Sequence, residues 1–337
     1  MSKYKSLQQT LGQIDNDYTA EENVFFKLTG SRLVQKNNFR VIKYNQPTLS
    51  IVIPYLNALK SISHTLDSLE SQKRVDLSKV EIILIDDGSK IFPFISKKKY
   101  DFNLKVIRFG ENKGRVRVRN VGLLLASNDI LMFLDADIIL HNLVLYNHLL
   151  VHSTLKGQGR NLLLVGYREW VRYDDSRVNN KPLLLNDINL DDDHRINITY
   201  FEKHLPYIKN KSLLGKTVKV VAETNFLKDL GHSKSYMDYT LPEEVYGFLF
   251  SLPLKLALKA GPVAETEKGW GADDVLIASR FIAAGAKVVP LLNSRGLHLF
   301  DANPQATEEQ KLKERKINRE WYSKLLNEPF IEFTSHN

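Results

Sequence analysis

The stretch ILMFLDADIIL, residues 130–140, places two carboxylates directly after a run of five apolar side chains. Asp135 and Asp137 are separated only by Ala136, so two like charges stand at the end of a segment apolar enough to be a buried strand. An isolated D-x-D pattern is as often a pair of solvated aspartates at a strand end as it is a binding site. The surrounding sequence must decide between these two interpretations.

The segments before this stretch alternate as strands and helices do. LSIVIP (49–54) and VEIILID (80–86) are apolar runs without alternation, which predicts strands buried on both faces, and LKVIRF (104–109) predicts a further strand. Apolar residues repeat at helical spacing over 59–69, and a second helix is expected over 114–126. Strand, helix and strand in this order predict an α/β domain with a Rossmann-like, mostly parallel central sheet flanked by helices.

In open sheets of this kind, ligands bind beyond the carboxyl ends of the strands. Asp86 and Asp87 follow one predicted strand, and Asp135 and Asp137 follow another. We therefore expect these four carboxylates to gather along one edge of the sheet.

The composition is that of an ordinary folded domain. The chain has 337 residues, of which 43% are hydrophobic and 26% charged, so it can bury a sizeable core. Its 47 Lys and Arg against 39 Asp and Glu give a net charge of +8, compatible with nucleic acid, anionic lipid or a phosphorylated small molecule as partner. The absence of cysteine excludes disulfides and Cys-based metal sites and is compatible with a reducing cytoplasm.

The second half of the chain is less regular. NLLLVGY (161–167) predicts a strand and residues 200–214 a helix, with a long polar stretch between them. The pattern becomes regular again with a helix over 252–260, a helix that opens at GWGADD (269–274), and the strand KVVPLL (287–292).

The blocks SIVIPYLN, IILIDDGS and RFGENKGRVRVRNVGLLLASNDILMFLDADIIL, in this order and spacing, resemble the nucleotide-sugar half of family 2 glycosyltransferases of the GT-A type. This resemblance covers residues 49–140. A second block, GWGADDVLIASRFIAAGAKVVPL, is similar to the acceptor-side motif W-G-x-[ED]-D found in galactosyltransferase-like members of the same superfamily. The resemblance implies a GT-A fold and a UDP-sugar donor.

The resemblance also implies a division of the chain. We expect an N-terminal extension with some helix over 1–46, a nucleotide-sugar-binding half over 47–140 and an acceptor-binding half over 141–300. A charged C-terminal helical tail is expected over 301–337. Segment 170–245 matches no motif, and we expect it to build the acceptor site.

Carried over to this sequence, the resemblance makes Pro54, Tyr55 and Asn57 part of the loop that holds the nucleotide base. Leu56 stands where the family commonly has Tyr, so the order of the stacking residues differs here. Asp87, the second aspartate of DDGS, matches the position that hydrogen bonds a uracil ring. A carboxylate accepts well from a pyrimidine N–H, which favours uridine. Taken without the surrounding strands, DDGS favours a simple turn.

The segment NKGRVRVRN (112–120) opens a predicted helix with several arginines. Helix N-termini and guanidinium groups both favour anionic phosphates. The resemblance places Gly114, Arg119 and Asn120 near the nucleotide. For Arg115 and Arg117 we favour a solvated face.

The resemblance assigns the D-x-D motif to the donor sugar and its metal. Asp135 and Ala136 are expected at the nucleotide sugar, and Asp137 at a divalent ion. His298, just after a predicted strand, matches the position of a metal-binding imidazole, although a lone histidine is more often an ordinary residue. Oxygen ligands together with substrate phosphates suit Mn²⁺ or Mg²⁺.

The GWGADD segment supplies the acceptor side of the expected site. Trp270 offers a flat face to a sugar ring, Gly271 allows close backbone approach, and Asp273 is expected to bind the acceptor. Asp274 matches the family's general base. The alternative is an ordinary helix start with a buried tryptophan, in which the helix dipole stabilises the two carboxylates. Asp273 stands where the family usually has Glu.

The expected function is inverting transfer of a sugar, a hexose or an N-acetylhexosamine, from a UDP-sugar to a hydroxyl acceptor. That acceptor is a polysaccharide, a lipid-linked sugar, a protein or a peptide. A catalytically silent sugar-binding protein is one alternative. A nucleic-acid-binding protein is a weaker one, because the aromatic residues do not interleave with the basic ones.

Location is predicted from what the sequence lacks. No apolar run approaches the roughly 18 residues of a membrane span, and the first residues lack the apolar segment of a secretory signal. A soluble cytoplasmic protein is therefore expected. The basic helix near the C-terminus leaves peripheral contact with anionic lipid at the inner membrane face as an alternative to a solvated helix, which we favour. The oligomeric state is left open.

Overall fold

A computed structural model describes residues 4–14, 16–91, 99–156, 161–179, 182–190, 193, 242, 245, 247–265, 271–300 and 307–333. Segment 200–214, expected to be helical, and most of the expected acceptor segment 170–245 lie outside these ranges.

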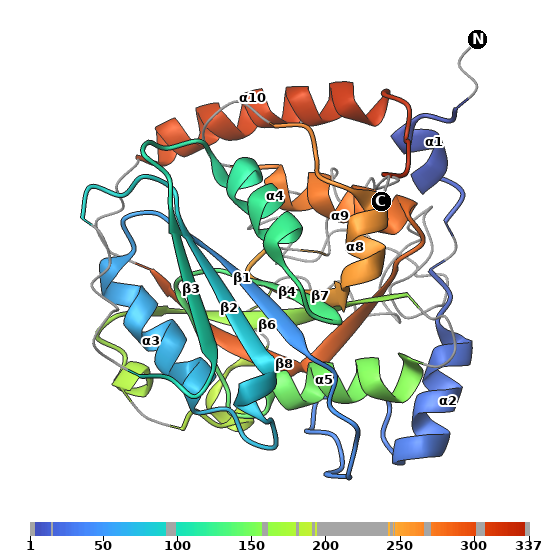
Figure 1. Cartoon of the computed structure of the whole chain (residues 1–337), viewed down its shortest axis with the longest axis vertical. Helices are drawn as coiled ribbons and strands as arrows, with labels where there is room; N and C mark the ends of the chain where they lie inside the picture. Colours follow the sequence, from blue (N-terminus) through green and yellow to red (C-terminus); the bar gives the residue numbers. More distant parts are fainter. Residues whose placement is uncertain are drawn as a thin grey trace, which may run out of the picture.

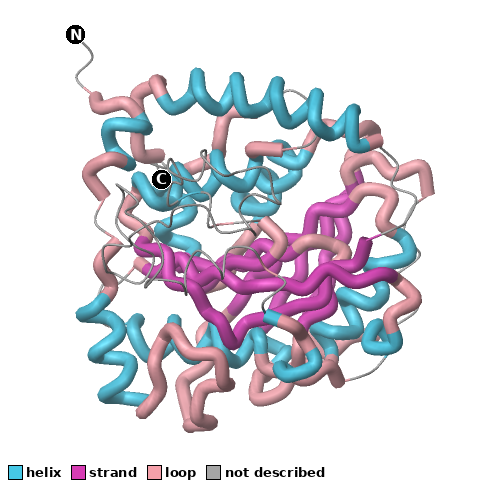
Figure 2. The backbone as a smooth tube through the Cα atoms, turned by 180° about the vertical axis from the view of Figure 1, so that it is seen from behind, coloured by secondary structure: helices cyan, strands magenta, loops and turns pink. Residues whose placement is uncertain are grey.

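A single mixed sheet forms the centre of the molecule (Figures 1 and 2). Its strands are β1 (Leu49–Tyr55), β2 (Val80–Asp86), β3 (Asn103–Arg108), β4 (Ile130–Leu134), β5 (Ile138–Leu140), β6 (Leu162–Arg172), β7 (Leu249–Pro253) and β8 (Lys287–Phe300). Their order across the sheet is β3-β2-β1-β4-β7-β6-β8-β5. β7 runs antiparallel to β4 and β6, and β5 antiparallel to β8, while the other pairs are parallel. The expected mostly parallel α/β sheet is confirmed.

Helices cover both faces of this sheet. They are α1 (Leu7–Leu11), α2 (Thr19–Thr29), α3 (Leu59–Glu70), α4 (Arg115–Leu125), α5 (Val144–Leu155), α8 (Leu254–Ala260), α9 (Asp273–Ala283) and α10 (Glu308–Leu326), with 3₁₀ turns at Leu77–Lys79, Ser176–Asn179 and Leu185–Asp187. Helices α4, α8, α9 and α10 lie on one side, and α2, α3 and α5 on the other (Figure 1). Figure 2 shows the strands between these two groups.

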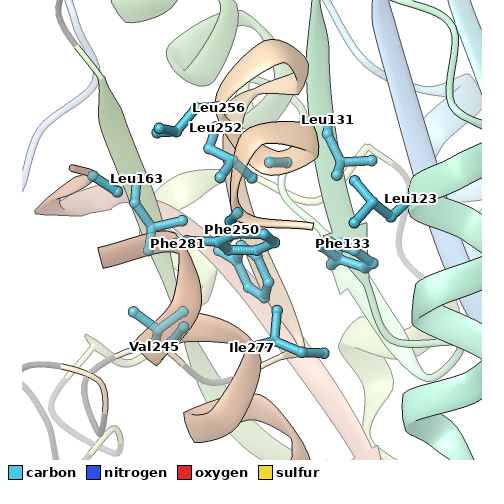
Figure 3. Packing of buried hydrophobic residues seen from close by; sticks show 14 of the residues in the cluster. Leu123, Leu131, Phe133, Leu163, Val245, Phe250, Leu252, Leu256, Ile277 and Phe281 are labelled. Carbon is cyan, nitrogen blue, oxygen red and sulfur yellow. The ribbon is translucent and has the colours of Figure 1, made fainter. Parts of the chain in front are cut away.

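The hydrophobic core beneath α8 and α9 holds in place the two elements next to the acidic motifs, β4 and α9. Phe250 of β7 packs between Phe133 of β4 and Phe281 of α9 (Figure 3), with ring centroids 5.1 and 6.3 Å apart. Aromatic pairs of this kind add about 0.5–1.5 kcal/mol each beyond the area they bury. The end of β4 and the start of α9 are therefore anchored to one packed cluster.

Helix α4 approaches the sheet closely. Gly122 faces β1, and a Cβ at this position would overlap the side chain of Val52. Val116 and Val118 of the same helix are buried, whereas Arg115 and Arg117 are exposed as expected. The absence of a side chain at Gly122 therefore lets α4 lie directly on the sheet, which determines where Arg119 points.

The N-terminal segment packs as part of the same body. Phe25 of α2 and Phe39 are buried, with their ring centroids 5.0 Å apart, in a cluster with Tyr146 of α5. The Asn16 side chain also exchanges two hydrogen bonds with the backbone of Val288 in β8, at 2.9 and 2.7 Å. This segment therefore helps to bury one face of the sheet.

Two strands run further than their apolar patterns predicted. β8 continues from Leu292 to Phe300, and β6 from Tyr167 to Arg172, because the two pair in parallel over Tyr167–Arg172 and Arg295–Phe300. The register shifts between Val165 and Tyr167. The additional residues bring both strands to the edge of the sheet where Asp135 and Asp137 lie.

In the part of the chain that the structure describes, no helix is at once long and apolar enough to span a bilayer.

Candidate functional site

The D-x-D motif lies in a turn between two strands. Asp135 follows β4 and Asp137 precedes β5, so a turn displays the two carboxylates. Backbone hydrogen bonds hold both ends: Asp135 N–H donates to the Phe248 carbonyl at 3.1 Å, and Leu299 N–H donates to the Asp137 carbonyl at 2.8 Å. Ala136 between them is buried.

His298 and the two aspartates form one cluster. The ligand atoms of Asp135, Asp137 and His298 all lie within 4.8 Å of one another. His298 Nε2 is 3.3 Å from Asp137 Oδ1, a buried oxygen without a well-formed hydrogen bond among the described residues. Two carboxylates and an imidazole fit the donor set of a divalent cation, and the buried Asp137 Oδ1 is an oxygen that such a cation could bind.

The charge state of Asp137 suits this arrangement. Burial opposes ionisation of its carboxyl group, but His298, Arg115 and a backbone hydrogen bond together outweigh that effect, and the pKa of Asp137 lies below its ordinary value. The carboxylate is therefore ionised at neutral pH and available to a cation.

Arg119 joins the D-x-D turn to the start of α9. Its Nη1 contacts Asp273 Oδ2 and lies 2.5 Å from Asp274 Oδ1, and its Nη2 lies 3.4 Å from Asp135 Oδ1. The Arg119 side chain is 2% exposed, that of Asp273 7% and that of Asp274 25%. Of the two α9 aspartates, Asp274 thus offers more of its carboxylate to a substrate.

The two α9 aspartates differ in ionisation. Burial and the neighbouring Asp274 raise the pKa of Asp273 above its ordinary value. Burial also opposes ionisation of Asp274, but the Arg119 guanidinium, the Gly247 N–H and Arg115 together outweigh burial, and the pKa of Asp274 is lowered. Asp274 is therefore ionised at neutral pH, as a group that accepts a proton must be.

Helix α9 begins at Asp273, as the sequence predicted, so both carboxylates lie in its first turn. Gly271 lies two residues before Asp273, and a Cβ added at Gly271 would lie 3.2 Å from Cγ of Arg315 in α10. Trp270, the expected sugar-stacking residue, lies outside the described residues.

The expected nucleotide-binding residues lie together beyond β1 and β2. Asp87 accepts hydrogen bonds from the backbone N–H groups of Lys113 and Gly114, at 2.6 and 3.0 Å. Its own N–H donates to the Tyr55 carbonyl at 2.8 Å. The loop after β2 is therefore tied both to the end of β1 and to the turn that opens α4.

Asn57 links the same loops. Its N–H donates to Ser89 Oγ at 2.8 Å, and its Oδ1 accepts from Lys90 N–H at 3.0 Å. Pro54 is half-buried in β1, and Tyr55 is 1% exposed. Burial together with Asp86 raises the pKa of Tyr55 to about 12, so the phenol stays neutral.

Asn120 faces the protein interior. Its Nδ2 donates to the Val263 carbonyl at 2.8 Å, and its Oδ1 accepts from Val263 N–H at 3.0 Å. This amide thus holds α4 to the chain that follows α8.

Several residues beside the cluster were not predicted from the sequence. Trp170 of β6 stacks on His298, with centroids 3.9 Å apart and planes at 17°, and Arg168 Nη1 lies 3.1 Å from His298 Nδ1. The Arg168 guanidinium also covers the rings of Trp170 and Phe248, at 4.4 and 4.9 Å. The β6–β8 register places Trp170 opposite His298, and this register could not be read from the sequence.

Residues 50–152 match the family model described as Glycosyl transferase family 2. Among curated proteins, the chain is 32% identical over 142 residues to the amylovoran biosynthesis glycosyltransferase AmsB of Erwinia amylovora, covering 40% of this chain and 46% of AmsB. It is 34% identical over 93 residues to a teichoic acid poly(glycerol phosphate) polymerase of Staphylococcus epidermidis, covering 26% of this chain and 12% of that protein.

The match thus spans less than half the length of each of these two relatives. Among solved structures, the crystal structure of S. aureus TarS 1-349 in complex with UDP-GlcNAc is similar with a TM-score of 0.50 and 16% sequence identity. That similarity covers 83% of this chain and 70% of the TarS chain. At this identity the likeness establishes the fold.

Proposed function

The chain belongs to glycosyltransferase family 2 and has the GT-A fold, and on this basis we propose that it transfers a sugar from a UDP-sugar to a hydroxyl acceptor with inversion. One observation carries the proposal. The donor-side pair Asp135 and Asp137 and the α9 pair Asp273 and Asp274 meet within one cluster, bridged by Arg119.

Uridine diphosphate is the proposed nucleotide part of the donor. The TarS neighbour is in complex with UDP-GlcNAc, and the loops of Asn57, Asp87 and Gly114 lie together beyond β1 and β2. A carboxylate such as Asp87 suits the N–H of a pyrimidine ring. We assign Pro54 and Tyr55 to the floor of this site.

Asp137 and His298 are the proposed ligands of Mn²⁺ or Mg²⁺, and Asp135 faces the donor sugar. A bound divalent ion would stabilise the negative charge that builds on the departing diphosphate. The ionised carboxylate of Asp137, with its buried Oδ1 beside His298, supports this assignment.

Asp274 is the proposed general base. It takes the proton of the acceptor hydroxyl while that oxygen bonds to the anomeric carbon, and the bond from this carbon to the diphosphate oxygen breaks, which releases UDP. General-base assistance of this kind is typically worth about 10²–10⁴ in rate. We place the acceptor against Trp270, Gly271 and Asp273. A polysaccharide, a lipid-linked sugar, a protein or a peptide satisfies this chemistry.

The test is a screen of UDP-sugars for slow hydrolysis with Mn²⁺ present, in which water replaces the acceptor. Release of UDP from one donor would support an active transferase and identify the sugar. Binding of UDP without turnover of any donor would point instead to a silent sugar-binding protein.

Replacing Asp274 tests the base. Asp274→Asn should lower the turnover of that donor by at least about 10²-fold, because the amide cannot take the proton. UDP binding measured by calorimetry should be unchanged. Asp174→Asn, at an exposed aspartate beyond β6, is the matched control and should keep full turnover. An active Asp274→Asn variant would remove Asp274 from this role.

A further inference from the structure

Arg119 is a buried cation that the proposed mechanism does not use. It is the bulkiest of the fully buried side chains in the described part of the chain. Removing a guanidinium from water is expensive, and a protein tolerates it only where carboxylates surround the group with good geometry. The partners of Arg119 are aspartates of the proposed site, so its position bears directly on the reaction.

The guanidinium meets both halves of the site at once. Nη1 contacts Asp273 and Asp274 in the first turn of α9, and Nη2 lies 3.4 Å from Asp135 after β4. Three carboxylates held this close would repel one another without a cation between them. A planar, forked donor can hold several oxygens in fixed directions, which a lysine ammonium does less well.

The part of α4 that carries Arg119 is held at two points. The next residue, Asn120, is bonded at both ends of its amide to the Val263 backbone, and the next turn of α4 lies directly on β1 at Gly122. The backbone position from which the Arg119 side chain extends is therefore fixed relative to the sheet.

Gly247 completes this arrangement from the other side. A Cβ at Gly247 would overlap Arg119 Nη2 and Asp274 Oδ1, and its backbone N–H donates to the Asp274 carboxylate. Only glycine lets the backbone approach this ion pair. The pair is thus enclosed between a helix and a backbone segment that precedes β7.

We propose that Arg119, backed by Gly247, is a positioning residue that holds the base Asp274 at a fixed place relative to the donor-side Asp135. This inference rests on the proposed function. It gives Arg119 a role different from direct contact with the nucleotide, because its two terminal nitrogens are directed at the carboxylates.

The kinetic test uses Arg119→Lys in the full chain. Lysine keeps the charge but cannot reach the three carboxylates together, so kcat should fall by about 10- to 100-fold, as expected when a reacting group is displaced by about 1 Å. The KM for the donor and the UDP affinity by calorimetry should change by less than about threefold. A tenfold loss of UDP affinity with kcat preserved would overturn the proposal in favour of nucleotide binding.

Val118→Ala is the control for general damage to the helix. Val118 is buried on α4 beside Arg119 and lies in the apolar cluster rather than the carboxylate cluster. It should lower the denaturation midpoint and leave kcat unchanged. An equal fall of kcat in both variants would mean that Arg119 acts only through fold stability.

A second measurement needs no substrate. Arg119→Gln should lower the urea midpoint because it leaves crowded carboxylates without their cation, and adding Asp273→Asn should restore part of that loss. Independent, additive losses would refute the ion-pair arrangement even if the chain is an active transferase. Where Arg119→Gln does not fold, Arg119→Lys takes its place in the same cycle. If no donor is turned over, a coupled midpoint still supports the arrangement while the proposed function fails.

Discussion

At the scale of single residues, Asp137 makes the sharpest prediction. Its carboxylate is ionised and its Oδ1 is buried beside His298. Asp137→Asn should weaken Mn²⁺-dependent UDP binding by at least about tenfold, since even partners outside a ligand set usually cost 10–100-fold in metal affinity. Calorimetric titration of UDP with and without Mn²⁺ measures this.

The matched control is Asp101→Asn, at an exposed aspartate before β3. It should keep the full effect of Mn²⁺ on UDP binding. If the Asp137→Asn variant also keeps the full effect of Mn²⁺ on UDP binding, Asp137 is not a ligand of the ion.

How far single residues could be predicted depended on whether their position follows from local sequence. Asp135 and Asp137 follow a strand and Asp273 and Asp274 open a helix, so their placement at these element ends could be read directly. The carboxylate partners of Arg119 could not be predicted, because an arginine near the start of a helix can bind a phosphate or a carboxylate equally well. Nothing in the local sequence indicated a role for Gly247, because a side chain at this position would clash only once Arg119 of α4 and Asp274 of α9 lie together.

At the scale of elements, β1, β2 and β4 were predictable from their apolar runs, whereas β7 and the end of β8 were not. After Leu292 the chain reads Asn293, Ser294 and Arg295, which breaks the apolar run. All three are nonetheless buried, and the Arg295 guanidinium is satisfied there because it donates to the Leu292 and Lys36 carbonyls at 2.7 and 2.8 Å. Distant backbone carbonyls of this kind leave no trace in a local pattern.

Helix α5 carries buried histidines that make its stability depend on pH. His148 lies between Ser251 Oγ and Ser294 Oγ, at 2.7 and 2.8 Å, and His152 Nε2 is 2.9 Å from the same Ser251 hydroxyl. Burial lowers the pKa of His152 to about 3 and that of His141, just before the helix, to about 4. All three imidazoles are therefore neutral in the folded protein at neutral pH.

The free energy of unfolding should fall as the pH drops below about 6.5, the ordinary pKa of histidine in an unfolded chain. Between that pH and about 4 the unfolded state binds protons that the folded state excludes, so stability is full above 6.5 and is lost towards the folded pKa values. Each excluded proton costs about 1.4 kcal/mol per pH unit. Urea unfolding at pH 7.5, 6.5, 5.5 and 4.5 measures the slope.

His152→Gln should reduce this slope, because the amide can still bond the Ser251 hydroxyl but does not titrate. His64→Gln, at a half-buried histidine of α3, is the control and should keep the slope of the parent chain. Equal slopes for His152→Gln and the parent chain would mean that α5 does not govern the acid limit.

At the scale of the whole molecule, the first 46 residues were expected as an extension because their apolar residues are scattered. In the structure, Tyr18, Phe25, Leu33 and Phe39 fill a cluster with Tyr146 of α5 and Leu291 of β8. Scattered apolar positions look like an extension when read locally, and only the complementary face of α5 and β8 shows that they have a core to enter.

The neighbouring phenylalanines of α2 test whether this segment belongs to one cooperative unit. Phe25 is fully buried against Phe39, whereas Phe26 is 45% exposed beside Arg32. Phe25→Ala should lower the free energy of unfolding by about 3–5 kcal/mol, and Phe26→Ala by less than about 1 kcal/mol. The three tryptophans, at positions 170, 270 and 321, all lie outside this segment. If their fluorescence midpoint in urea shifts with Phe25→Ala, the loss is transmitted through the whole fold, whereas an unshifted midpoint would make the N-terminal segment a separate unit.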